Sequence, residues 1–203
     1  AIMQKGIYDR GASFIQIGLI VTTTFSFVLI PLLTDAMSDH NHVLMNRYTN
    51  ASLKITLLIS VAAGIGLINI LPMMNHVFFK TDQLSFTLSI YMLTVIGVSL
   101  IMMDIALLQV MNQIRPIFIG VMSGLLFKII FNVIFIHFMG ILGASISTVL
   151  SLMIFVTILH YEVVKYYRFN RMRAFIVKLM SALIIMSVVI QGLRMLLDRK
   201  STR

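Results

Sequence analysis

The sequence has no cysteine and only seven acidic residues among its 203 positions. The absence of cysteine excludes disulfide bridges, thiolate nucleophiles and cysteine-ligated metal sites. Charged residues make up 11% of the chain, whereas they make up roughly a quarter of an ordinary soluble domain. Apolar residues make up 59% of the chain, which is more apolar surface than a soluble fold of this size hides from water. The composition therefore indicates an integral membrane protein.

Motifs for catalysis and cofactor binding are also missing. The sequence contains no GxSxG nucleophile segment, no Walker-type GxxxxGK[ST] phosphate loop and no segment of paired carboxylates. His40 and His42 have no carboxylate or cysteine companions at the spacing of metal ligands, and the other three histidines are scattered near span ends. We therefore expect no enzyme activity, no cofactor and no metal site.

Long apolar runs are the main feature of the chain, and each run is long enough to cross the hydrocarbon core of a bilayer. The polar stretch 35–50 has room for a short surface helix. The run 116–161 is too long for one crossing, so we expect a turn at Gly140–Gly143, where glycine permits a tight connection. Lipid offers no partners for backbone polar groups, which predicts an all-α integral membrane bundle of about six helices. The predicted spans are 12–33, 55–74, 84–110, 116–137, 142–161 and 175–197.

The net charge of +9 is explained by the loops between these spans, so no nucleic acid partner is expected. The run 165–178 is the densest basic cluster near membrane ends, which places its side in the cytoplasm and both ends of the chain outside. The chain begins with Ala1 and shows no signal peptide, which predicts a fragment of a longer protein. The basic residues assigned to the cytoplasmic side are Arg47, Lys54, Arg115, Lys165, Arg168, Arg171, Arg173 and Lys178.

Asp9 and Arg10, at the start of the first span, are the first candidates for substrate binding. The planar guanidinium of an arginine binds phosphate oxygens through two parallel hydrogen bonds and stays charged. The alternative is a flanking charge whose side chain reaches back to the membrane surface.

Lys128 is the second candidate, because it lies roughly 18 Å deep in the fourth span at 1.5 Å per residue. A charge at that depth lines a cavity or forms a structural pair, and Asp104 of the third span is a candidate partner. Asn132 follows one turn later on the same face, where its amide could bond across helices. Small residues at Gly120, Ser123, Gly124, Gly140, Gly143, Ala144 and Ser147 predict close helix packing.

Several segments resemble one family in their order along the chain. These are KGIYDRG at 5–11, IQIG at 15–18, LIPL at 29–32, LLQVMNQIRP at 107–116, GLLFKIIFN at 124–132 and GILGASIST at 140–148. Together they are similar to the bacterial polysaccharide flippases of the MOP superfamily, and most similar to MurJ-like lipid II flippases of Gram-positive bacteria. His137 departs from the pattern, because relatives often have proline there.

The resemblance implies a transporter of roughly fourteen spans in two pseudo-symmetric halves, of which this chain supplies most of the second. It places Asp9 and Arg10 at a central cavity, where the arginine holds the lipid pyrophosphate. The implied partners are a lipid-linked sugar precursor, membrane lipids and the remaining half of the transporter. The implied location is the bacterial cytoplasmic membrane. The same segments recur in flippases for cell-wall, capsule and spore precursors, so they do not distinguish lipid II from related substrates.

The resulting hypothesis is a flippase that moves an undecaprenyl-pyrophosphate-linked precursor to the outer leaflet by alternating access. One alternative is a cation-coupled multidrug exporter of the same superfamily, for which acidic cavity residues are expected. Another is a membrane assembly subunit without a transport cycle, which would tolerate neutral residues at Arg10 and Lys128.

Overall fold

The computed structural model describes residues 2–38, 42–79, 85–167 and 172–201, except for some side chains within the helices, those of 2–12 among them. The regular structure in this part of the chain is entirely α-helical, as predicted. The helices are α1 (Ile2–Ser38), α2 (His42–Phe79), α3 (Ser85–Met92), α4 (Thr94–Val110), α5 (Ile114–Met139), α6 (Ile141–Tyr166) and α7 (Met172–Ser201).

The helix bounds differ from the predicted spans chiefly near the polar residues. The described residues of the stretch 35–50 do not form a separate surface helix, because they belong to the end of α1 and the start of α2. No glycine or proline lies between residues 42 and 54, so α2 continues unbroken from its polar start into its apolar part. The predicted third span is divided at Leu93, where the Leu93 N–H donates to the Ile90 carbonyl, one residue short of α-helical spacing.

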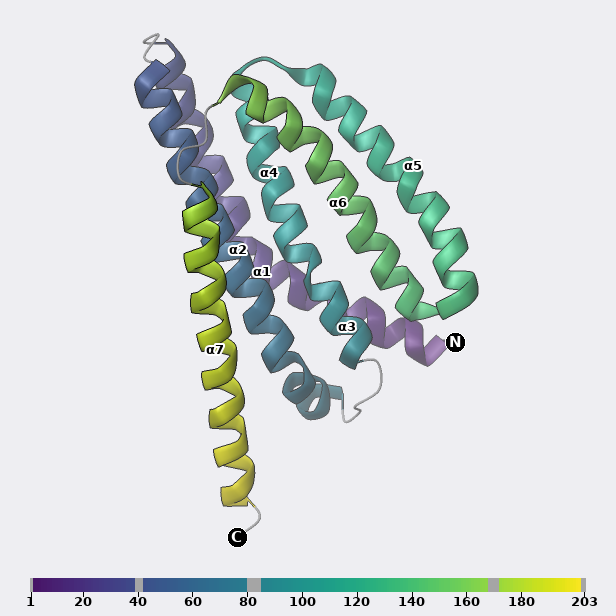
Figure 1. The fold of residues 1–203 in the computed structure, drawn as a ribbon. Helices are drawn as coiled ribbons and strands as arrows, with labels where there is room; N and C mark the ends of the chain where they lie inside the picture. The colour runs from purple at the N-terminus through teal and green to yellow at the C-terminus, as the bar shows by residue number, and fades with distance from the viewer. Residues whose placement is uncertain (1, 39–41, 80–84, 168–171, 202–203) are drawn as a thin grey trace.

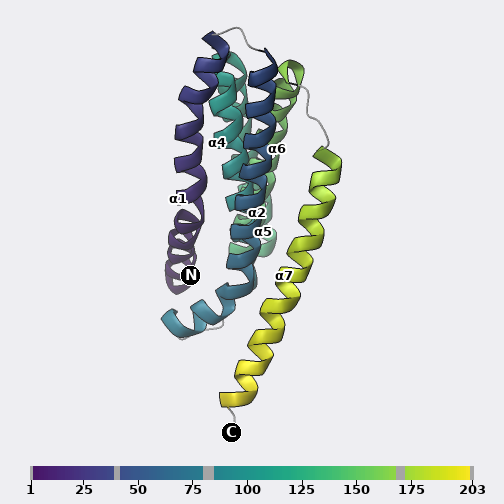
Figure 2. The same cartoon turned by 90° about the vertical axis from the view of Figure 1, so that its left-hand side faces the viewer.

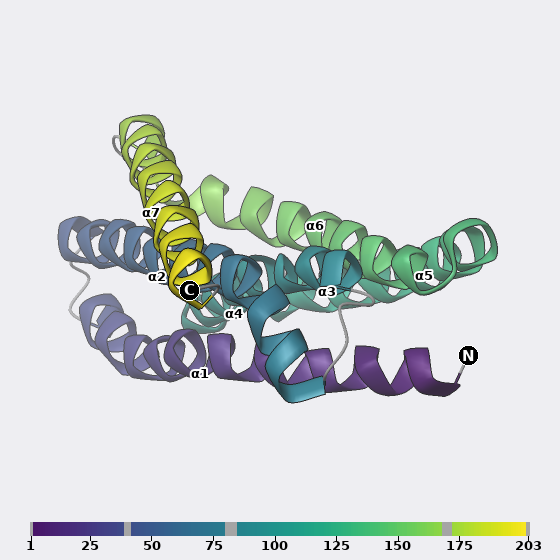
Figure 3. The ribbon, with the colours of Figure 1, turned by 90° about the horizontal axis from the view of Figure 1, so that it is seen from below.

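The helices run alternately up and down, with α3 and α4 together forming one pass, so that α1, α4 and α6 end at the end of the bundle where α2 and α5 begin (Figure 1). Helix α4 packs against α1, α2 and α6, whereas α5 packs mainly against α6 and α7 only against α2 within the described residues. Figures 2 and 3 show α1 and α7 on opposite sides of α2. The buried core accordingly lies around α4, and α5 and α7 form the periphery.

Two apolar clusters hold this core together. The larger one joins α1, α2, α4 and α6 and ends at Tyr167, and the smaller one joins α1, α2, α3 and α4 around Leu88 and Val95. One face of α2 adds buried hydroxyl groups at Thr49, Ser52, Thr56 and Ser60, which recur at helical spacing. The interior of the bundle is therefore apolar with a stripe of hydroxyls.

The α5–α6 hairpin depends on glycine at both its turn and its contact face. The chain reverses at Gly140, whose φ of 60° lies in the left-handed region that glycine adopts without a steric penalty. A Cβ atom on Gly143 would overlap the backbone carbonyl of Phe135, and one on Gly120 would lie 2.7 Å from the Phe155 ring. The two helices approach this closely because these positions carry no side chain.

Four described helices are long and apolar enough to cross a membrane. Many of their large apolar side chains are exposed, and α5 buries only Gly120 and Gly124. An exposed apolar surface of this extent requires lipid or another protein against it. The prediction of an all-α membrane bundle is therefore confirmed. The four helical segments are Val43–Met74, Ser85–Val110, Ile114–Met139 and Ile141–Tyr166, and α7 has a shorter apolar part, Ala174–Ile190.

We expect Gly143→Ala to destabilise the bundle by about 1–3 kcal/mol, because the new methyl group collides with backbone rather than with a movable side chain. The measurement is the thermal unfolding midpoint in detergent. Gly66→Ala is the matched control, since its added Cβ meets nothing within 4 Å beyond the backbone of its own helix, and alanine is the better helix former. Equal midpoints for the two variants would contradict the packing described for Gly143.

Tyr167 follows the last residue of α6, and burial raises the pKa of its phenol to about 12. The Thr49 hydroxyl lowers this pKa to a smaller extent, although the two hydroxyls do not meet hydrogen-bond geometry. An unfolded tyrosine titrates near pH 10. The free energy of unfolding therefore falls by up to about 2 kcal/mol as the pH rises from about 10 to about 12.

We therefore expect Tyr167→Phe to reduce the loss of thermal stability between pH 9 and pH 11.5. The control is Tyr166→Phe, which changes an exposed tyrosine one residue away. The same alkaline loss in both variants would show that Tyr167 does not cause it.

Candidate functional site

Asp9 and Arg10 lie on the first part of α1, at the end of the bundle that also holds the α5–α6 turn (Figure 1). Their side chains lie outside the described residues, so their contacts with a cavity or a ligand stay predictions. The backbone places them on a long continuous helix rather than on a loop. A helix of this kind is a rigid support for a binding residue.

Lys128 lies on α5 and is partly buried. No carboxylate of the described residues lies within 4.0 Å of its ammonium group, so the suggested pair with Asp104 does not form. The reason is the helix order: α5 contacts α4 little and packs on α6, and α4 in turn packs on α6. Helix α6 therefore supplies the partner of Asp104, and Lys128 is left on the outer helix.

Asn132 and Ser147 join the two helices of the hairpin. The Ser147 hydroxyl is in hydrogen-bond contact with the Asn132 side-chain oxygen, and it also lies 2.9 Å from the Ala144 carbonyl. Ser147 is fully buried, and Gly143 lies one turn before it on α6. Gly140 and Gly143 bring the helices close enough for this contact, whose geometry suits a structural role.

Asp104 and His160 form a polar pair that the sequence did not predict. Asp104 on α4 has no exposed surface, and it is the one fully buried charged residue in the described part of the chain. The His160 ring nitrogen Nδ1 lies 3.4 Å from each carboxylate oxygen. The two residues are 56 positions apart on α4 and α6, so no sequence spacing could have linked them. The only sequence signal is that each is an ionisable residue within an apolar span.

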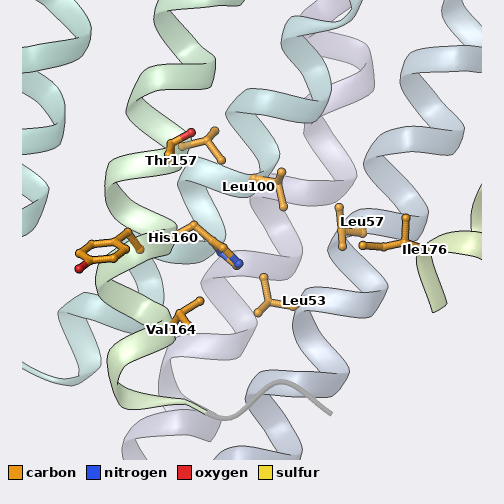
Figure 4. Close-up of a pocket in the computed structure, with 9 residues that line it drawn as sticks. Leu53, Leu57, Leu100, Thr157, His160, Val164 and Ile176 are labelled. Carbon is orange, nitrogen blue, oxygen red and sulfur yellow. The ribbon is translucent and has the colours of Figure 1, made fainter. Parts of the chain in front are cut away.

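The pair lies beside a cavity of about 450 Å³ between α2, α4, α6 and α7. Figure 4 shows the His160 ring extending from α6 toward Leu53 of α2, with Leu100 of α4 and Ile176 of α7 on the surrounding walls. The lining is largely apolar, and the polar side chains in it are His160, Thr157 and Tyr161. This arrangement places an imidazole in an apolar recess, and its lining has no carboxylate of the kind that a metal-dependent transferase needs in clusters. No group of three metal-binding side chains occurs in the described ranges.

Comparison with known proteins supports the membrane fold. The family model described as "Lipid II flippase MurJ" matches residues 14–201, a match that begins just after Asp9 and Arg10. The chain is 26% identical over 186 residues to the uncharacterized membrane protein YabM of Bacillus subtilis, which covers 92% of this chain and 35% of YabM. It is also 26% identical over 143 residues to the lipid II flippase MurJ of the same organism, covering 68% of this chain and 26% of that flippase.

The chain thus spans about a third of one relative and about a quarter of the other. The family match nevertheless covers most of the chain, and its apolar helices agree with a multi-pass membrane protein. The chain belongs to the MurJ lipid II flippase family.

Proposed function

We propose that this chain is part of a flippase that carries an undecaprenyl-pyrophosphate-linked cell-wall precursor across the bacterial cytoplasmic membrane. The substrate is lipid II or a related lipid-linked oligosaccharide. The observation that carries the proposal is the family match over residues 14–201 of a helical membrane bundle. The proposal concerns the whole protein, of which the bundle supplies one part.

The physical problem is the head group of such a lipid. A sugar chain and a pyrophosphate cannot enter hydrocarbon unaided, because each buried charge costs several kcal/mol even after relaxation. The lipid tail can remain in the bilayer, beside apolar surfaces such as those of α5 and α7. A polar path for the head group, opened to one leaflet at a time, solves this problem.

The packing of the bundle suits such alternating access. The α5–α6 hairpin is tied together by glycine contacts and by the Asn132–Ser147 contact, so it would move as one unit. Helix α7 packs only on α2 among the described helices, and the Asn69 amide donates to the Ser187 hydroxyl at 3.2 Å between them. Movement of α7 relative to α4 and α6 would therefore break few contacts of the core.

Arg10 is the residue to which we assign the pyrophosphate. The guanidinium offers two parallel donors to phosphate oxygens and keeps its charge at all physiological pH values. Asp9 would orient it, and Lys128 is a second candidate for contact with the head group. The remaining part of the transporter, which the resemblance to MurJ-like flippases implies, would complete the cavity.

A cation-coupled multidrug exporter is less well supported. Such an exporter needs carboxylates that face its substrate, yet Asp104 is fully buried against His160. The other described carboxylates, Asp35 and Glu162, are not in the core, and Glu162 accepts a hydrogen bond from Lys165 at 2.6 Å. The described carboxylates therefore form no acidic binding surface.

The test is complementation by the full-length parent protein in cells depleted of their own lipid II flippase. We expect the wild type to restore growth and lipid II translocation, and Arg10→Ala to reduce translocation roughly ten- to hundredfold. That range corresponds to the loss of charged hydrogen bonds worth about 1.5–3 kcal/mol. Membrane levels of all variants are matched by immunoblot.

Arg115→Ala, which removes an exposed arginine near the start of α5, is the control and should behave as the wild type. Failure of the wild type would mean another lipid-linked substrate or no flippase activity. Full rescue by Arg10→Ala would show that Arg10 only anchors α1 at the membrane surface.

A further inference from the structure

The contact between Asp104 and His160 is too weak to hold a bare carboxylate in the core. Its two distances of 3.4 Å are longer than the 2.7–2.9 Å of a strong charged hydrogen bond. The carboxylate oxygen Oδ2 is buried and has no hydrogen-bond partner in the described structure. A buried carboxylate with so little compensation is strongly unfavourable.

A proton on the pair removes this cost. Carried on the carboxyl group, it makes the aspartate neutral, and carried on the imidazole, it turns the contact into an ion pair. Both arrangements hold one proton between α4 and α6, and they differ from the unprotonated pair by one unit of charge. The attraction between the two helices therefore depends on whether the proton is present.

The cavity gives this proton a route in and out. Asp104 is fully buried, but the His160 side chain keeps 40% of its surface exposed and lines the cavity (Figure 4). Imidazole binds and releases protons in the physiological range and passes them to a hydrogen-bonded partner. The pair thus joins a buried acid on α4 to an accessible base on α6.

We propose that Asp104 and His160 form an exchangeable proton-binding site at this cavity, and that proton binding there is coupled to the movement of α6 against α4 during transport. The coupling rests on the proposed flippase function, whereas the proton site itself does not. Because α6 carries α5 with it through the glycine contacts, a change at the pair would be transmitted to the whole hairpin.

No other titratable group within the described residues contacts Asp104. The site is therefore built around this acid and this base. Titratable groups on the surrounding helices include Asp35 on α1, Lys54 on α2, Tyr91 on α3, Arg115 on α5, Tyr161 on α6 and Lys178 on α7.

The first experiment detects the proton without transport. The full-length protein is labelled with ¹⁵N-histidine in nanodiscs, and the His160 signal is assigned by its absence in His160→Gln. We expect this signal to shift with pH, and the midpoint of that shift to differ between the wild type and Asp104→Asn. A signal that stays constant, or a midpoint unchanged in Asp104→Asn, would overturn the proton site. If Asp104→Asn does not fold, the test is whether the wild-type His160 signal shifts with pH.

The second experiment measures coupling. Proteoliposomes with the full-length protein and a fluorescent lipid II analogue are assayed with and without an imposed pH gradient. We expect the gradient to change the wild-type rate several-fold, and this ratio to fall to about one in His160→Gln. The matched control is His137→Gln, whose histidine ring packs against Phe138 at the end of α5 and should keep the wild-type ratio.

The outcomes separate the two proposals. No transport by the wild type, together with a titrating His160, would contradict the flippase function and leave the proton site supported. A wild-type transport rate that is the same with and without the pH gradient would overturn the coupling. An equal ratio in His160→Gln and wild type would also overturn it, because the gradient would then act elsewhere.

Discussion

The bundle is governed by the need of every polar group to find its partner inside the protein, because hydrocarbon offers none. The helices supply hydrogen-bond partners for the backbone N–H and C=O groups, and many side-chain hydroxyls donate to carbonyls of the preceding turn. Ser99 donates to Val95 at 2.7 Å and Thr148 to Ala144 at 2.9 Å. Asp104 has no such local solution, since a carboxylate has no proton to donate to a carbonyl. Its partner must come from another helix, so the α4–α6 contact is where a fully buried charged residue takes part in helix packing within the described part of the chain.

Close packing supplies the second constraint. Lipid is as apolar as the side chains, so helices associate through contact area and gain little from leaving the solvent. Gly120 and Gly143 allow α5 and α6 to touch along their length, and Gly18 and Gly64 have neighbouring side chains within 3.0–3.2 Å of an added Cβ. A hairpin held in this way is stiff, whereas α7, which rests on α2 alone in the described structure, is free of such contacts. The proposed alternating-access movement would use such stiff and loosely attached parts.

Sequence reasoning succeeded where the signal is local. Apolar runs predicted the helices, and Gly140 predicted the chain reversal, because both follow from the chemistry of adjacent residues. It was less successful at the polar start of α2, where helical propensity carried the helix through residues expected to form a separate segment. For the candidate site, Asp104 was noticed as an intramembrane charge, but Lys128 was suggested as its partner instead of His160. The Arg10 role comes from family resemblance, and nothing in the described side chains bears on it.

The amino-acid sequence by itself determined the membrane environment, the helical class, the turn between α5 and α6 and the family, since each follows from composition, run length or ordered motifs. The tertiary structure decided which helix lies beside which. With α6 packed against both α4 and α5, it separates Lys128 from Asp104 and brings His160 to the carboxylate. Helices that associate through shape have no sequence periodicity that indicates which other helices they pack against. Only the folded bundle could therefore show that a buried acid and an accessible base share one cavity.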